Sequence, residues 1–95
     1  MKAARKGDIS TPDPCGARPR PNKQGSPNVN INGRPAHRVG DAWVVHNCPK
    51  RGGHGAVTVE GSPNVNINGK PAARVSDLIS CGSKIAEGSE NVNIN

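Results

Sequence analysis

The sequence has almost no aromatic residues and no long hydrophobic run. Trp43 is the only aromatic side chain, and phenylalanine and tyrosine are absent. The longest apolar run, residues 42–45, is far shorter than the ~20 residues that a membrane-spanning helix needs. With 12 glycines and 9 prolines in 95 residues, helix-breaking residues recur too often for a helical bundle. These absences argue against both a helical bundle and a transmembrane helix.

The N-terminal residues also lack the apolar core of a secretory signal peptide. Residues 1–8 contain three basic side chains and lead into no apolar stretch. We therefore expect a protein that is made in the cytoplasm and is exported, if at all, without a signal peptide. Disulfides are rare in the cytoplasm, and the chain has three cysteines, an odd number. We expect reduced thiols, and with histidines nearby these point towards a metal site.

The charge is strongly basic and unevenly distributed. The formal net charge is +6, and residues 1–25 hold six basic and only two acidic side chains. Such a balance suits nucleic acid or an acidic partner, but single-strand binders usually add stacking aromatics. A small zinc-containing nucleic-acid-binding module is therefore a minor alternative. Its basic side chains would be those near the cysteines and histidines, namely Arg18, Arg20, Lys50 and Arg51.

An internal repeat carries the fold prediction. Residues 26–41 return almost letter for letter as residues 62–77. A third copy of the first half lies at residues 89–95, and the matching second half lies at residues 2–8. The pattern predicts three repeats, one of them completed by the two ends of the chain. We expect one domain over residues 1–95, monomeric on its own.

Each repeat contains the alternation Asn-Val-Asn-Ile-Asn, which places Val and Ile on one face of a strand. An Asn-Gly pair, a signal for a tight hairpin turn, follows in two repeats. We therefore expect an all-β fold, a small cone-shaped β-prism of three hairpin repeats with three-fold pseudo-symmetry and little or no helix. The predicted core consists of the alternating aliphatic residues Val29, Ile31, Val65, Ile67, Val92 and Ile94.

This core is thin, and domains with so little core usually need a staple, which a structural zinc can supply. The connections between half-repeats, residues 9–25, 42–61 and 78–88, hold all three cysteines and two of the three histidines. Loops that leave equivalent strand ends of a prism converge at one end. One ligand from the first connection, two from the second and one from the third would form the closed tetrahedral site that is typical of structural zinc.

The sequence resembles a known family. Pro-Ala-Ala-Arg at residues 71–74, with variants at 35–38 and 2–5, and the preceding Gly-Ser-Pro-x-Val-x-Ile-x-Gly run resemble the PAAR-repeat family over essentially the whole chain. The resemblance implies a zinc-tipped β-prism on the blunt end of a trimeric, β-helical VgrG-type spike. Such spikes belong to type VI secretion systems and to contractile phage tails, and we favour the former.

The resemblance also implies a metal site at the apex of the cone. The family usually uses three histidines and one cysteine, whereas the ligand set implied here has two of each. The implied ligands of one structural Zn²⁺ are Cys15, His46, His54 and Cys81, with Cys48 as the alternative to His46. The residues do not distinguish zinc from iron.

We expect a non-enzymatic spike tip, one copy per trimer, that forms the membrane-piercing point. It is exported with the spike, and effector proteins are further candidate partners. An enzyme with Cys48 as nucleophile and His46 or His54 as base is disfavoured, because the chain is small and a four-ligand metal site is closed.

Three further features of the repeats carry structural predictions. His37 replaces the alanine of the motif, and we expect it to face the surface or a partner. We expect Trp43 to cover the base of the loops. Arginine and aspartate recur three residues apart, and we expect each pair to fix a turn with the modest strength of an exposed ion pair. These pairs are Arg5 with Asp8, Arg38 with Asp41, and Arg74 with Asp77.

Overall fold

The fold consists of short strands and bridges. The computed structural model describes residues 1–48 and 52–95, without the side chains of His46, Asn47 and His54. This part of the chain contains no helix, and therefore no helix that could cross a membrane. The all-β prediction is confirmed. Three antiparallel two-stranded sheets pair β1 (Asn30–Ile31) with β2 (Arg34–Pro35), β3 (His46–Cys48) with β4 (Gly52–His54), and β5 (Asn66–Ile67) with β6 (Lys70–Pro71).

The two Asn-Gly pairs form the predicted hairpin turns. Asn32 and Gly33 have φ angles of 54° and 76°, and Asn68 and Gly69 have 55° and 76°. Positive φ at both central residues is the requirement of a type I′ turn, which Asn-Gly meets at little cost. Ile31 therefore pairs with Arg34 across the first hairpin, and the second hairpin has the same register.

The strands are shorter than the alternating pattern predicts, because the first residues of that pattern form a turn with the preceding serine. The Ser26 hydroxyl accepts hydrogen bonds from the backbone N–H groups of Asn28 and Val29, at 3.2 and 2.9 Å. Ser62 and Ser89 accept the equivalent pairs of bonds in the other repeats. The N–H of the valine in each run is then engaged in this turn, and the ladder begins at the valine carbonyl, which accepts from Ala36, Ala72 or Ala3.

The two ends of the chain lie side by side. Lys2 pairs with Asn93 in an antiparallel bridge, and the N–H of Ile94 donates to the carbonyl of Met1 at 2.7 Å. The N–H of Ala3 donates to the carbonyl of Val92 at 3.0 Å. These are the contacts that a repeat divided between both ends requires.

A closed ring of backbone hydrogen bonds joins the three repeats. The N–H of Ala4 donates to Ala73, that of Ala73 to His37, and that of His37 to Ala4, over 3.0, 3.0 and 3.1 Å. These residues occupy the same place in each copy of the repeated motif. The repeats thus make equivalent contacts at this level, while the three-fold prism as a whole stays a prediction.

The core has two apolar clusters rather than one. Val65 and Val92 pack against the first cluster, whereas Val29 is 38% exposed and was wrongly placed in the core. The first cluster is Ala3, Ile31, Ala36, Ile67, Ala72 and Ile94. The second, which the repeat pattern does not predict, is Ala4, Trp43, Ala56, Ala73, Ile79 and Ile85.

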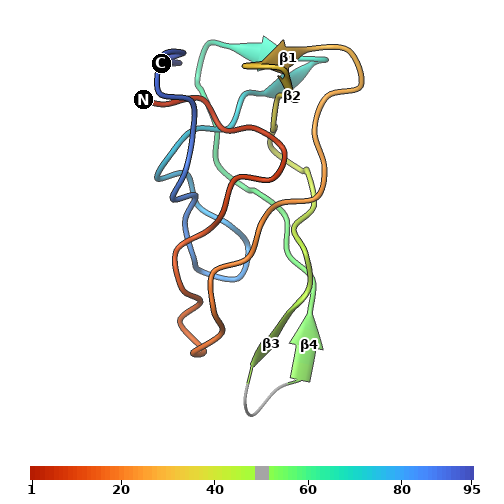
Figure 1. Cartoon of the computed structure of the whole chain (residues 1–95), viewed down its shortest axis with the longest axis vertical. Coiled ribbons are helices and arrows are strands. Elements are labelled where there is room, and N and C mark those ends of the chain that lie inside the picture. Colours follow the sequence, from red (N-terminus) through yellow and green to blue (C-terminus); the bar gives the residue numbers. More distant parts are fainter. Residues whose placement is uncertain (49–51) are drawn as a thin grey trace.

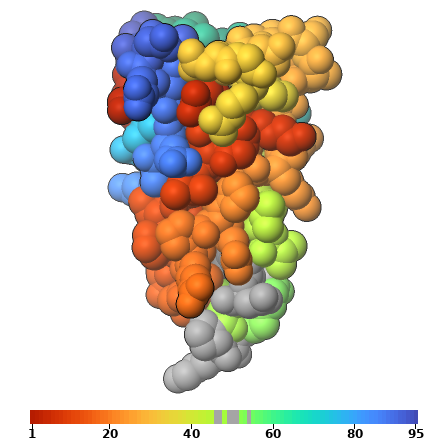
Figure 2. Space-filling model, in the orientation of Figure 1, coloured from red at the N-terminus to blue at the C-terminus, as the bar shows by residue number. Residues whose placement is uncertain are grey.

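The molecule is elongated, with principal extents of 37, 23 and 21 Å. Figure 1 shows β1, β2 and both termini at one end and the β3–β4 hairpin at the other. We call these the broad end and the narrow end, because the surface narrows between them in Figure 2. The broad end holds the repeated hairpins, and the narrow end holds the segments that connect them.

Candidate functional site

The repeated arginine–aspartate pairs form ion pairs, as predicted. Their Nη2–Oδ1 distances are 3.0, 2.9 and 2.7 Å for Arg5–Asp8, Arg38–Asp41 and Arg74–Asp77. Each aspartate side chain is at most 1% exposed, so the pairs are buried rather than exposed. Hydrogen bonding to its aspartate raises the pKa of each arginine above the ordinary value.

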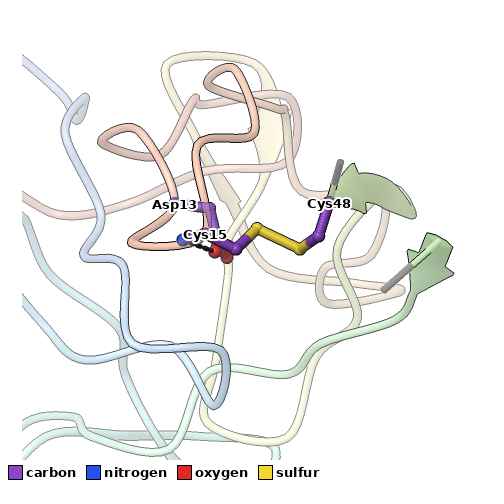
Figure 3. A group of neighbouring side chains, drawn as sticks. All are labelled: Asp13, Cys15 and Cys48. Carbon is purple, nitrogen blue, oxygen red and sulfur yellow. Dashed lines mark hydrogen bonds between the residues drawn. A yellow bond between two sulfur atoms is a disulfide. The ribbon is translucent and has the colours of Figure 1, made fainter. Parts of the chain in front are cut away.

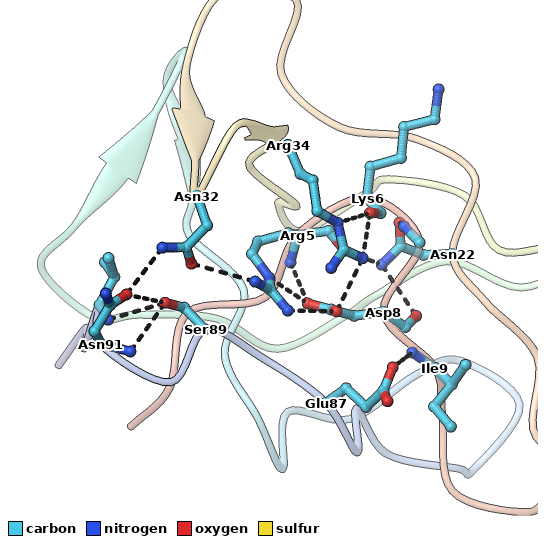
Figure 4. Close-up of polar contacts among 12 residues, drawn as sticks. Arg5, Lys6, Asp8, Ile9, Asn22, Asn32, Arg34, Glu87, Ser89 and Asn91 are labelled. Atoms are coloured by element: carbon cyan, nitrogen blue, oxygen red, sulfur yellow. Dashed lines mark hydrogen bonds and ion pairs between the residues drawn. The ribbon is translucent and has the colours of Figure 1, made fainter.

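The first pair belongs to a larger network on one side of the molecule, drawn in Figure 4. Arg34 Nη2 donates to Asp8 at 3.1 Å and to the carbonyl of Lys6 at 2.8 Å. Arg5 Nη1 donates to Asn32 at 3.2 Å, and Asn32 donates to Asn91 at 2.9 Å. The network links the N-terminal segment to the hairpins of the broad end, and its polar atoms are engaged in holding the fold.

His37 is buried, so the prediction that it faces the surface or a partner is wrong. Its side chain is 0% exposed, and its ring meets Trp43 edge to face with the centroids 5.4 Å apart. Nδ1 lies 2.8 Å from the carbonyl of Gln24 and Nε2 lies 2.7 Å from the hydroxyl of Thr58. The larger residue replaces alanine here because the interior offers it two polar partners.

The hydrogen bonds of His37 fix its neutral form. A carbonyl only accepts, so Nδ1 carries the proton and donates to Gln24, and Nε2 accepts from the Thr58 hydroxyl. Thr58 also accepts from Trp43 Nε1 at 2.9 Å. A proton on Nε2 would leave the Thr58 hydroxyl hydrogen without its acceptor. Burial lowers the pKa of His37 below its ordinary value, although Gln24 and Asp41 oppose the shift.

Acidification is expected to destabilise the fold through His37. The folded pKa is lowered, so below about pH 6.5 the unfolded chain takes up a proton that the folded chain does not. The contribution of neutral His37 to the free energy of unfolding is therefore complete above that pH. It is lost as the pH falls towards the pKa of His37 in the folded protein. Urea unfolding between pH 7.5 and 5 should show this loss, and His37→Ala, which installs the residue of the other repeats, should show less of it. Equal pH dependence in both proteins would contradict the assignment.

At the narrow end, Cys15 and Cys48 form a disulfide, so the expectation of reduced thiols fails for them in this structure. Figure 3 shows the bond joining the first connection to β3. The two residues are 33 apart in sequence, and their Cα atoms lie 5.6 Å apart. The odd number of cysteines is reconciled by Cys81, whose thiol is free.

Asp13 completes a group that has metal-binding chemistry. One carboxylate oxygen and the sulfurs of Cys15 and Cys48 all lie within 4.8 Å of one another, and the Cys15 N–H donates to Asp13 Oδ1 at 2.8 Å. Two thiolates and a carboxylate suit zinc. A disulfide sulfur carries no charge, however, and thiolate is the form that ligates metal. The donor set therefore fits zinc in its reduced form and does not fit it as the disulfide.

One predicted ligand, Cys81, is not part of this group. Cys81 is half-buried against the second apolar cluster, with its sulfur 3.0 Å from the Ser83 hydroxyl, and it is not among the described residues gathered around Cys15. The backbones of His46 and His54 pair directly across the β3–β4 hairpin, but their side chains lie outside the described part. The four-ligand set of Cys15, His46, His54 and Cys81 stays a prediction.

The basic side chains of the nucleic-acid alternative are only partly described. Arg18 is exposed and Arg20 is half-buried, while Lys50 and Arg51 lie outside the described residues. No cluster of cations can therefore be built from these four, and the alternative gains no support.

The broad end presents a band of asparagines that link neighbouring repeats. Asn68 Nδ2 donates to Asn28 Oδ1 at 2.8 Å, in the same way that Asn32 donates to Asn91. Three further exposed asparagines occupy equivalent positions in the three repeats, namely Asn30, Asn66 and Asn93. The broad end is thus a polar face on which the same side chains recur.

Comparison with known proteins supports one family. The family model for the PAAR motif matches residues 50–95, which include the second hairpin and the third half-repeat. No curated protein matches the chain. The PAAR motif suggests a spike-tip protein of the kind found in type VI secretion systems or phage tails. The match supports the assignment of this chain as a PAAR-repeat protein.

Proposed function

We propose that the protein caps the trimeric VgrG-type spike of a type VI secretion system, with one copy on each trimer. The PAAR motif carries this proposal, because it is generally associated with spike proteins. The protein is a monomer before assembly. It leaves the cytoplasm as part of the spike.

The broad end is the proposed docking face. A single chain can make equivalent contacts with all three subunits of a trimer only if it offers each subunit a similar surface. The hairpins β1–β2 and β5–β6 and the paired chain ends supply three such units. Their exposed equivalent residues, Asn30, Asn66 and Asn93, offer amide donors and acceptors to the same groups of three identical subunits.

The narrow end is the proposed piercing point. It lies at the far end of the longest axis from the hairpins of the broad end (Figure 1). The bond from Cys15 to Cys48 ties the first connection to β3 there. A rigid end transmits force to a target membrane better than a loose one, and effector proteins would then be carried on the remaining surface.

We propose that the protein is not an enzyme. The thiol that an enzymatic mechanism would use, Cys48, is 3% exposed and bonded to Cys15. A nucleophilic cysteine must be an accessible thiolate. Turnover of an ester or peptide panel that Cys48→Ser abolishes would overturn this part of the proposal.

The docking face can be tested with an immobilised cognate spike trimer. The protein should bind at micromolar concentration or below, and the triple variant Asn30→Arg, Asn66→Arg, Asn93→Arg should weaken binding at least tenfold, since it places three charges in the contact. Val45→Arg adds a charge at an exposed position next to β3, at the narrow end, and it should bind like the wild type. Failure of the wild-type protein to bind would overturn the function. Equal binding by the triple variant would overturn the docking face.

A further inference from the structure

The structure offers two exclusive ways to join the same two segments at the narrow end. The sulfurs of Cys15 and Cys48 are bonded, and the carboxylate of Asp13 lies within 4.8 Å of both. Asp13 and Cys48 are 7% and 3% exposed, and Cys15 is half-buried. These groups come together from residues 33 apart in sequence, so whatever binds them holds the first connection to β3.

We propose that Cys15 and Cys48 are a redox-controlled staple: as thiolates they hold a zinc ion together with Asp13, and as a disulfide they hold each other. Zinc binding releases the two thiol protons. Oxidation then removes two electrons from the two thiolates, forms one S–S bond and releases Zn²⁺. The electrons, with two protons from water, pass to a disulfide or diazene oxidant, which is reduced by two electrons. A thiol reductant reverses the step by thiol–disulfide exchange.

The two states exclude each other for a chemical reason. Zinc needs the negative charge of the thiolates, and the disulfide has no such charge. Oxidation therefore releases the ion, and bound zinc protects the thiolates from oxidation. Zinc prefers four ligands, and Asp13, Cys15 and Cys48 supply three of them.

The half-buried position of Cys15 gives the exchange an entry. Attack by a thiolate requires access to one sulfur of the disulfide. Cys48 is almost fully buried, whereas Cys15 is partly accessible. A small reductant such as dithiothreitol therefore attacks the sulfur of Cys15, and the thiolate of Cys48 leaves.

The staple has a use that rests on the proposed function. A tip that is assembled in a reducing cytoplasm and then delivered outside it meets both redox conditions. Zinc would join the first connection to β3 before export, and the disulfide would join them after it. The two segments of the narrow end would thus stay linked under both redox conditions. The inference itself concerns the isolated protein, and its test needs no spike. A failed test would leave the spike function untouched.

The test measures zinc and free thiols in the same full-length protein. Reduced anaerobically and given zinc sulfate, the protein should bind one Zn²⁺ per chain. After oxidation with diamide it should release that zinc and retain one free thiol, that of Cys81. Native mass spectrometry reads the metal, and alkylation after denaturation counts the thiols. Zinc that remains bound in the oxidised protein, or a reduced protein that binds none, would overturn the proposal.

Serine variants assign the ligands. Cys15→Ser and Cys48→Ser should each lose the disulfide and weaken zinc binding at least a hundredfold. Cys81→Ser is the matched control and should keep both. Zinc binding that depends on Cys81 and not on Cys48 would return the site to the ligand set predicted from the sequence and overturn this one. If the variants do not fold, Co²⁺ in the wild-type protein decides. Its sulfur-to-metal absorption band should vanish on oxidation with diamide, whereas a band that persists would assign the sulfur ligand to Cys81 and overturn the proposal.

Discussion

Replacing Trp43 by alanine is expected to lower the free energy of unfolding by about 3–5 kcal/mol, the usual cost of removing a buried tryptophan. Trp43 is 2% exposed and is the largest side chain of the second apolar cluster. Its ring packs against His37, and its Nε1 donates to Thr58. The other members of that cluster are alanines and isoleucines, which are too small to fill the space. Urea unfolding followed by circular dichroism measures the loss, since the variant has no tryptophan fluorescence.

Two further variants show whether the loss of stability comes from the packing of Trp43 or from a fold that any substitution destabilises. Val59→Ala removes an aliphatic side chain that is 48% exposed, and it should cost about 0.5 kcal/mol or less. Trp43→Phe keeps most of the ring and removes the hydrogen bond to Thr58, so its cost should lie between the other two. A loss below about 1 kcal/mol for Trp43→Ala would show that the second cluster does not hold the fold.

Replacing Asp41 by alanine is expected to cost about 3–5 kcal/mol, because it leaves a buried arginine without its counter-ion. Asp41 is 0% exposed and Arg38 is 5% exposed. The carboxylate accepts bonds from the N–H, Nε and Nη2 of Arg38, all at 2.9 Å. Removing it breaks all three bonds, and urea unfolding at pH 7.5 measures the effect.

Glu90→Ala is the control for the loss of a negative charge. Glu90 is exposed, so water replaces its interactions and the variant should stay within about 0.5 kcal/mol of the wild type. The double variant Arg38→Ala, Asp41→Ala should be more stable than the sum of the single losses predicts, because neither partner is then left buried alone. Strictly additive losses would show that the two residues do not act as a pair.

The repeated parts of the structure were predictable because their signals are local. Asn-Gly needs only its own backbone preferences to turn the chain, and Arg38 and Asp41 lie three residues apart. The Asn-Gly turn occurs in two repeats and the arginine–aspartate pair in all three, so each prediction could be checked against more than one copy. The pairing of residues near positions 2 and 93 also follows a pattern that is visible in the sequence, because each end carries half of a known unit.

The connecting segments were not predictable in this way. Trp43, Ile79 and Ile85 form a second cluster, but no period relates their positions. The burial of His37 depends on Thr58 and Gln24, which come from two different connections. The pairing of Cys15 with Cys48 rather than Cys81 is likewise a matter of how long segments pack, and three cysteines allow three different pairs.

The central claim is that one copy of this chain closes a trimeric spike. The most direct test is native mass spectrometry of the full-length protein mixed in excess with its cognate VgrG-type trimer. We predict a complex of three spike chains and one copy of this protein, with no further copy bound as the excess is raised. A spike that binds three copies, or none, would contradict the account.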